Sequence, residues 1–157
     1  MSNDLVFLQA ALEEANKALL HDDVPVGAIL VKDGKIIGRG HNQREELFDP
    51  CAHAEIQALR NASSSTANWN LSGSTLYVTL EPCIMCAGAI VSARVEELVY
   101  AAVDSKAGAL SLQLDILDNA KLNHRVKIRR GPLELECSEI LKRFFQKKRS
   151  QKKLTNL

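Results

Sequence analysis

Two short motifs thirty residues apart restrict what this chain of 157 residues can fold into. The first is His53-Ala54-Glu55, and the second is Pro82-Cys83-Ile84-Met85-Cys86. One imidazole and two thiolates are typical zinc ligands, and a site with three protein ligands leaves the fourth tetrahedral position open to water. The fold must therefore bring the motifs together, and the sequence predicts one Zn²⁺ per chain, held by His53, Cys83 and Cys86.

Glu55 stands two residues after His53 and is not needed as a ligand. Zinc lowers the pKa of a bound water from 15.7 to about 7, so that hydroxide becomes available at neutral pH. A carboxylate beside the metal can take the proton of that water and pass it to the substrate and its leaving group. We therefore predict that Glu55 is the catalytic residue of a hydrolytic zinc enzyme.

Both motifs are expected at the N-termini of helices. The two cysteines are three residues apart and share one face of a helix, and Pro82 suits the first turn. His53 and Glu55 are only two apart and would be splayed by about 200° inside a helix. His53 is therefore expected at the mouth of a helix that starts near residues 49–50 and ends near residue 61. Two helix N-termini would then face one metal.

A closed structural site is the alternative, with Cys51 or Cys137 as a fourth ligand. Glu55 argues against it, because a structural zinc needs no carboxylate beside it. A chain of this length also buries roughly two-thirds of its surface without a metal. We expect Cys137 to be a small core residue and Cys51 to lie close enough to His53 to line the site.

Composition excludes several classes of protein. Hydrophobic residues make up 46% of the chain and charged residues 25%, and no apolar run approaches the eighteen residues of a membrane span. The N-terminus lacks the pattern of a secretory signal. Four cysteines, two of them in a metal-type pair, fit a reducing compartment better than a disulfide framework. We expect a cytoplasmic protein that does not associate with membranes.

The order of elements predicts an α/β fold. Hydrophobic spacing predicts an amphipathic helix over residues 5–19. Asp33-Gly34 predicts a hairpin turn between antiparallel strands. Strands are expected at 26–31, 36–37, 75–79, 97–102 and 125–128, a surface loop at 62–71, and helices after Cys83, at about 111–118 and at about 133–153. The strands that flank the Cys83 helix should be parallel. The predicted fold is a three-layer α/β/α sandwich around a mixed five-stranded sheet, in a single domain over residues 1–157.

Charge is concentrated at the C-terminus. Seven basic residues and no acid lie from Lys142 to Lys153, whereas the rest of the chain carries 13 basic and 19 acidic residues, a net of −6. A basic helix that contains Phe144 and Phe145 can place cations along phosphates while an aromatic ring stacks on an unpaired base. The alternative is a solvated tail, with one phenylalanine of the pair in the core.

The H-x-E and P-C-x-x-C motifs together are the signature of the zinc nucleobase deaminases. Over nearly its whole length the chain resembles the bacterial tRNA-specific adenosine deaminases, which have a cytidine deaminase-like fold. The matching segments are residues 24–28, 40–42, 49–50, 52–56, 81–89, 123–126 and 144–145. The resemblance implies conversion of adenosine to inosine at the wobble position of a tRNA anticodon stem-loop, by a homodimer.

The resemblance also implies substrate-binding residues. Asn42 and Asn123 would hold the flipped nucleoside, and Val26 and Ala54 would wall its base. RNA contacts are implied at the C-terminal edge of the sheet and on the basic helix, by Asp104, Lys106, Phe145 and Arg149. The backbone N–H of Glu81 or Cys83 would lie near the reacting oxygen.

Each of these residues has an ordinary structural alternative. Asn42 can be a turn residue at a strand end, Asn123 a cap, and Asp104 with Lys106 ordinary loop charge. The chain departs from the family at Cys51, where threonine is frequent, and at residues 110–112, where small residues are common. These departures concern substrate contacts and leave the zinc ligands unchanged.

Two other functions fit the same motifs. One is a deaminase of a free base or nucleoside of the guanine or cytosine type, with the C-terminal segment capping its pocket. The other is an RNA-binding module with structural zinc and no turnover.

Overall fold

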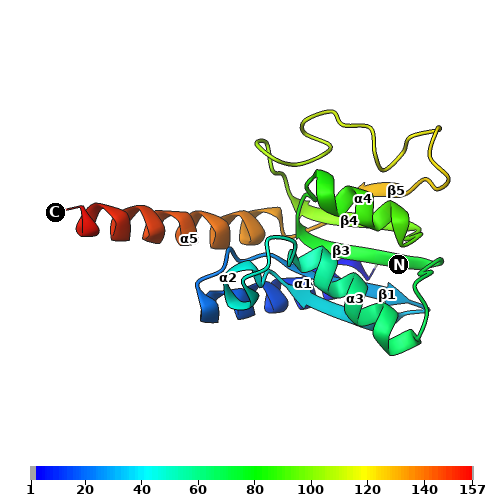
Figure 1. The fold of residues 1–157 in the computed structure, drawn as a ribbon, viewed down its shortest axis with the longest axis horizontal. Helices are drawn as coiled ribbons and strands as arrows, with labels where there is room; N and C mark the ends of the chain where they lie inside the picture. The colour runs from blue at the N-terminus through cyan, green and yellow to red at the C-terminus, as the bar shows by residue number, and fades with distance from the viewer. Residues whose placement is uncertain (1–2, 157) are drawn as a thin grey trace.

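The computed structural model describes residues 3–156, which form one five-stranded sheet with helices on both faces (Figure 1). The strand order is β2-β1-β3-β4-β5, and the strands are β1 Gly27–Lys32, β2 Lys35–His41, β3 Ser74–Leu80, β4 Glu97–Ala102 and β5 Lys127–Arg130. β1 pairs antiparallel with β2 and β3, whereas β3 with β4 and β4 with β5 are parallel. The predicted mixed sheet, with its hairpin and its parallel pair, is confirmed.

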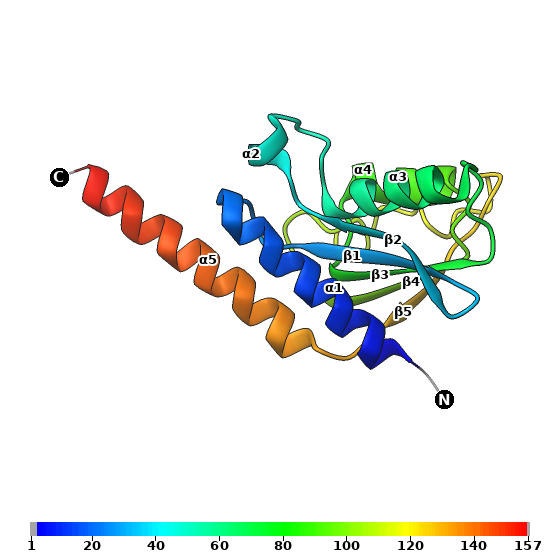
Figure 2. The same ribbon diagram turned by 90° about the horizontal axis from the view of Figure 1, so that it is seen from below.

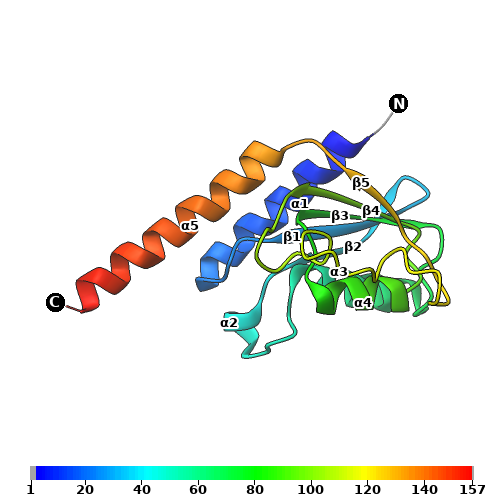
Figure 3. The same cartoon turned by 90° about the horizontal axis from the view of Figure 1, so that it is seen from above.

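The helices form the two outer layers (Figures 2 and 3). α1 (Asp4–Ala18) and α5 (Glu134–Thr155) cover one face, and α3 (Ala54–Thr66) and α4 (Ile84–Ser92) cover the other. Because side chains alternate along a strand, Leu76 and Val78 pack under α3 and α4 while Tyr77 packs on the α1 side. The three-layer α/β/α sandwich is confirmed.

Gly40 fixes how closely α3 lies on the edge strand β2. A Cβ atom at this position would be 2.4 Å from the carbonyl oxygen of Ala54 and 2.4 Å from the backbone nitrogen of Ala58. Only glycine allows this approach. The first turn of α3 is therefore held directly against the end of β2.

One end of the sheet collects the segments that carry the predicted site. β3 and β4 finish there, and α3 and α4 begin there. The short helix α2 (Arg44–Leu47) lies at this end, and α5 extends past it (Figure 2). We call it the carboxyl end of the sheet, after β3 and β4.

Several boundaries differ from the sequence prediction. α2 was not expected, and α3 begins at Ala54 and continues to Thr66, through part of the predicted loop. Ser65 and Thr66 donate their hydroxyls to the Ala62 carbonyl at 3.1 and 2.8 Å, which satisfies these polar side chains inside the helix. The helix predicted over 5–19 is α1, followed by the short 3₁₀ helix η1 (Leu19–His21).

The predicted helix at 111–118 is wrong, because this segment forms turns and irregular backbone. Gln113 has a left-handed φ of 57°, and the N–H of Ser111 is donated to a side chain instead of a helical carbonyl. β5 lies two residues later than predicted, and the last helix spans Glu134–Thr155. Within residues 3–156 no helix combines the length and apolar composition that a membrane span needs.

Candidate metal centre and active site

His53 and Cys83 are both N-cap residues. His53 precedes α3 with extended dihedral angles of −71° and 156°, and its carbonyl accepts the N–H of Gln57 at 3.0 Å. Cys83 precedes α4 with angles of −75° and 177°, and its carbonyl accepts the N–H of Ala87 at 2.9 Å. The prediction that two helix N-termini meet at the site is therefore confirmed, although Pro82 stands before the cap and not in the first turn.

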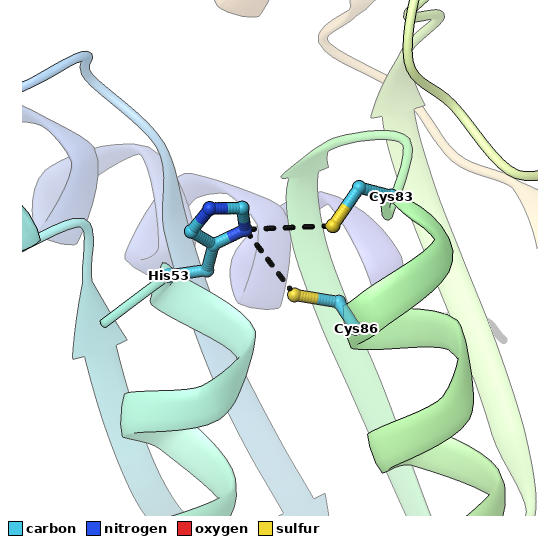
Figure 4. Close-up of side chains that lie close together, drawn as sticks. All are labelled: His53, Cys83 and Cys86. Carbon is cyan, nitrogen blue, oxygen red and sulfur yellow. Dashed lines mark hydrogen bonds between the residues drawn. The ribbon is translucent and has the colours of Figure 1, made fainter. Parts of the chain in front are cut away.

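The three predicted ligands converge (Figure 4). The Nδ1 atom of His53 lies 3.5 Å from Sγ of Cys83 and 3.5 Å from Sγ of Cys86. In a tetrahedral zinc site with bonds of about 2.05 Å to nitrogen and 2.3 Å to sulfur, these atoms would be about 3.6 Å apart. The donor set and its spacing thus fit a zinc ion with one further position open.

The two cysteines have pKa shifts of opposite direction. The pKa of Cys83 is lowered to about 3, because Cys86 and His53 hydrogen-bond to its thiolate. The pKa of Cys86 is raised, because it donates to Cys83 and is buried. The pKa of His53 is also raised, chiefly by its bond with Cys83. A divalent cation at this point would favour both thiolates and a neutral imidazole.

Glu55 is the second residue of α3 and is only 4% exposed. Its carboxyl group is not among the three converging ligand groups. Burial raises its pKa, and a hydrogen bond from Cys86 opposes this shift. A buried carboxyl group beside the donors, outside the ligand set, can hold and release a proton.

The closed four-ligand alternative is not supported. Among the residues that the structure describes, the group of His, Cys, Asp and Glu side chains close enough to hold a metal is His53, Cys83 and Cys86. Cys137 is fully buried on the opposite face of the sheet, beside Leu8 and Val99, as the core prediction required. Cys51 is exposed and lies outside this group.

Ala54 follows His53 directly, and backbone hydrogen bonds connect Val26 and Asn42 to this segment. The N–H of Asn42 is donated to the carbonyl of Val26 at 3.0 Å, and the next residue, Gln43, donates to the carbonyl of Ala52 at 2.9 Å. Val26 and Ala54 pack in the same apolar cluster. The side chain of Asn42 donates to Val24 at 3.1 Å and accepts from Arg44 at 3.3 Å, so the turn role is present. Its contact with a nucleoside stays a prediction.

Glu81 has a role that the sequence did not indicate. Its carboxylate is 3% exposed and accepts the N–H of Asp104 at 3.2 Å, together with the N–H and hydroxyl of Ser111 at 2.7 and 2.6 Å. A Cβ atom on Gly108 would meet this carboxylate at 2.0 Å. Glu81 therefore attaches the loop of residues 104–111 beside Cys83. The sequence feature that could have indicated this role is an acidic residue between a buried strand and Pro82.

The structure narrows the prediction that the backbone N–H of Glu81 or Cys83 lies near the reacting oxygen. The N–H of Glu81 is donated to the carbonyl of Ala102 at 2.8 Å, so it cannot serve a reacting oxygen. That hydrogen bond extends the pairing of β3 and β4 by one residue. Of the two backbone N–H groups, only that of Cys83 remains a candidate donor to the reacting oxygen.

Asp104 and Lys106 lie at the carboxyl end of β4. The carboxylate of Asp104 accepts the N–H groups of Lys106 and Ala107 at 3.2 and 3.1 Å, which shapes the turn. The Lys106 side chain is exposed. Asp104 thus has the loop role considered as its alternative, and an RNA contact stays a prediction for both residues.

The structure does not bring Asn123 to the other predicted site residues. The neighbouring His124 bonds through Nε2 to the carbonyl of Val95 at 2.6 Å, and β5 begins opposite Glu97, the first residue of β4. Parallel pairing forces the chain back to the amino end of the sheet before β5 starts. A six-residue strand is about 17 Å long, so Asn123 is remote from His53 in the same chain.

Phe145 and Arg149 lie on α5. Phe144 is buried, whereas Phe145 is 45% exposed and meets the Phe144 ring edge-to-face at 5.4 Å. One phenylalanine of the pair therefore belongs to the core, as predicted. Arg149 is exposed on the outer half of the helix.

Comparison with known proteins agrees with this geometry. The MafB19-like deaminase family matches residues 2–149. The tRNA-specific adenosine deaminase of Aquifex aeolicus is 50% identical over 144 residues, which cover 92% of this chain and 95% of that protein. This chain belongs to the family of tRNA-specific adenosine deaminases. The sequence-based resemblance is confirmed.

The fold of this deaminase is similar to those of solved deaminase structures. A structure from a study of A-to-I editing by tRNA:A34 deaminases at the wobble position of transfer RNA has 42% identity and a TM-score of 0.79, and covers 87% of this chain and 99% of that one. A guanine deaminase from Nitrosomonas europaea has 23% identity and a TM-score of 0.74, and covers 91% and 84%. The second similarity concerns the fold alone.

Proposed function

We propose that this deaminase converts adenosine to inosine at the wobble position of a tRNA anticodon loop, using one Zn²⁺ per chain. The observation that carries the proposal is the buried carboxyl group of Glu55 beside three donors spaced for a tetrahedral metal with an open position. Zinc, when bound there, supplies a nucleophilic hydroxide near neutral pH by lowering the pKa of water to about 7.

Glu55 moves the protons of the reaction. Its carboxylate accepts a proton from the attacking water and delivers it to N1 of adenine, which makes C6 electrophilic. Water oxygen adds at C6, and Glu55 then takes the proton of the new C6 hydroxyl and passes it to the exocyclic amine. The C6–N bond breaks, ammonia leaves, and the oxygen stays as the C6 carbonyl of inosine. One buried carboxyl group that exchanges protons twice is sufficient, since it is not occupied as a ligand.

The residues around the donors suit a nucleoside that is held by polar and apolar contacts. Asn42 retains hydrogen-bonding capacity beyond its two protein bonds, because an amide offers two donors and two acceptor positions. Val26 and Ala54 supply apolar walls. Lys106, Phe145 and Arg149 are exposed and suit phosphates or unpaired bases of the surrounding RNA.

A homodimer is the proposed working unit, and tRNA in the cytoplasm is its substrate. Asn123 is too far from His53 to act within its own chain, so a nucleoside contact requires a second copy. Mixing Glu55→Ala and Asn123→Ala chains tests this arrangement. Mixed dimers then contain one complete site and regain activity, whereas an Asn123 that acts within its own chain gives no recovery.

The substrate is tested with an anticodon stem-loop that has adenosine at the wobble position, alongside free adenosine, guanine and cytosine. We expect the stem-loop to be deaminated far faster, since RNA contacts supply binding energy that a free nucleoside lacks. Glu55→Ala is the inactive control. Efficient turnover of guanine or cytosine with an inert stem-loop would favour the free-base deaminase instead.

The metal is tested by elemental analysis and X-ray absorption. We expect one zinc per chain with two sulfur ligands, one nitrogen ligand and one light ligand from solvent. A site with three sulfurs would contradict the open position. Full metal content without turnover on any of the four substrates would leave the structural-zinc alternative.

A further inference from the structure

Phe48 is the most exposed large hydrophobic residue among those described, with 92% of its surface accessible. It lies between α2 and α3, five residues before His53. Exposed apolar side chains are ordinary when scattered. This one stands on the segment that leads into the metal-ligand motif, at the carboxyl end of the sheet (Figure 2).

The segment that carries Phe48 is fixed at both sides. The Asp23 carboxylate, 1% exposed, accepts the N–H groups of Glu45 and Glu46 at 2.7 and 3.2 Å and so holds the start of α2. The carbonyl of Arg44 accepts the N–H of Phe48, which has a left-handed φ of 51°. Phe48 therefore projects from a defined backbone.

Hydrogen bonds also connect this segment to the residues around His53. The N–H of Gln43 is donated to the carbonyl of Ala52 at 2.9 Å, directly before His53. The side-chain amide of Gln57 on α3 donates to Gln43 at 2.7 Å. A base stacked on Phe48 would thus lie over a segment whose two ends are Asn42 and His53.

Arg44 adds a positive charge to the same short segment. It is the first residue of α2 and lies four residues before Phe48 in the sequence. Arg44 is also next to Gln43, whose N–H is donated to the carbonyl of Ala52 directly before His53. The Arg44 guanidinium forms no ion pair or side-chain hydrogen bond with the residues from 3 to 156.

We propose that Phe48 is a stacking platform for the unpaired base next to the target adenosine, with Arg44 on an adjoining phosphate. The inference rests on the proposed RNA substrate. A nucleotide that enters the metal site leaves its neighbour without a stacking partner, and an aromatic ring replaces that partner for any base. A free base or nucleoside has no such neighbour.

The test compares binding of the anticodon stem-loop to Phe48→Ala, Phe48→Tyr and the parent, all in the Glu55→Ala background so that RNA is not consumed. Loss of the ring should weaken binding about 5- to 150-fold, which corresponds to about 1–3 kcal/mol at 1.4 kcal/mol per tenfold. Tyrosine should restore it. Trp69→Ala, an exposed aromatic between α3 and β3 at the other end of the sheet, is the matched control.

Stem-loops with an abasic nucleotide on either side of the target identify the stacked base. With that base removed, Phe48→Ala and the parent should bind the stem-loop with the same affinity. Phe48→Trp in a Trp69→Phe background should show fluorescence quenching with the intact loop and none with the abasic one.

Two failures are distinguishable. A parent enzyme that neither binds nor deaminates the stem-loop overturns the proposed function and this inference together. A parent enzyme that does both, while Phe48→Ala binds within twofold of it, overturns only the stacking platform.

Discussion

The carboxylate of Glu81 holds Ser111 by two hydrogen bonds, from the hydroxyl at 2.6 Å and from the backbone N–H at 2.7 Å. Glu81 lies two residues before Cys83, and Ser111 ends the loop that begins at Asp104. One buried side chain therefore links a metal ligand to the loop that carries Lys106. Disturbance of this link should alter RNA binding while the ligands stay in place.

Glu81→Gln should loosen the loop without loss of metal. A glutamine has one acceptor oxygen, and its NH₂ group would face an N–H donor that it cannot satisfy, a loss of about 1–3 kcal/mol for a buried group. We expect faster amide hydrogen exchange over residues 104–111, weaker stem-loop binding and unchanged zinc content. Ser111→Ala, which removes only the hydroxyl, should show a smaller change. Exchange equal to that of the parent would contradict the link.

Glu55→Ala and Glu55→Gln should keep the metal and lose turnover. General acid-base catalysis contributes about 10²- to 10⁴-fold, and a carboxyl group that exchanges protons in two steps should reach the upper part of this range. Single-turnover rates with the stem-loop, measured beside zinc analysis, check the expectation. Activity within tenfold of the parent would assign the proton transfer to another group.

The convergence of the three candidate ligands could be predicted from sequence because the signal is local. The residue types and the short spacings in His53-x-Glu55 and Cys83-x-x-Cys86 already restrict the donors to two helix N-termini. The strands and the longest helices were predictable for a similar reason, since their hydrophobic periods lie within each segment.

The turns at 111–118 and the helix α2 depend on distant residues. Glu81 takes the N–H of Ser111 from thirty positions earlier, and Asp23 caps α2 from twenty-two positions earlier. Neither partner is visible in the local pattern. The role of Asn123 came from resemblance, which carried no information about the end of the sheet on which this residue lies.

Lys147 and Arg149 should contribute to the salt dependence of RNA binding. Each phosphate contact changes the slope of log K against log salt by about 0.7 for a single strand, so the double change to alanine should flatten it by up to about 1.4. Lys148 is less suitable for this test, because it pairs with Asp22 and lies over the Phe144 ring, so its replacement would also change contacts within the protein. Filter binding between low and moderate salt measures the slope.

Lys32 and Lys35, on the hairpin of β1 and β2, provide the matched control with the same change of charge. Their replacement by alanine should leave the slope unchanged. If both double variants have the same slope, the basic residues of the C-terminal helix are solvated charges that do not contact RNA.

Tyr77 should make stability fall in alkaline solution. Its pKa is raised to about 12, chiefly by burial and then by Asp4, to which its hydroxyl donates at 3.1 Å. An unfolded tyrosine titrates near pH 10, so the stabilisation is complete below pH 10 and is lost as the pH rises through 12. The free energy of unfolding, measured with urea, should fall for the parent but not for Tyr77→Phe as the pH rises from 10 to 12. The same pH dependence in both proteins would contradict this prediction.

Helix α5 packs with only one of its halves. Cys137, Ile140 and Phe144 are its buried residues, and beyond Phe144 it extends into solvent for the rest of a length of about 33 Å (Figure 2). Apart from Lys148, which pairs with Asp22 and lies over the Phe144 ring, the side chains of residues 145–156 are exposed. Charges at these exposed positions can therefore change with little effect on the melting temperature. If the proposed RNA substrate is correct, such changes would alter the strength of RNA binding and its dependence on ionic strength.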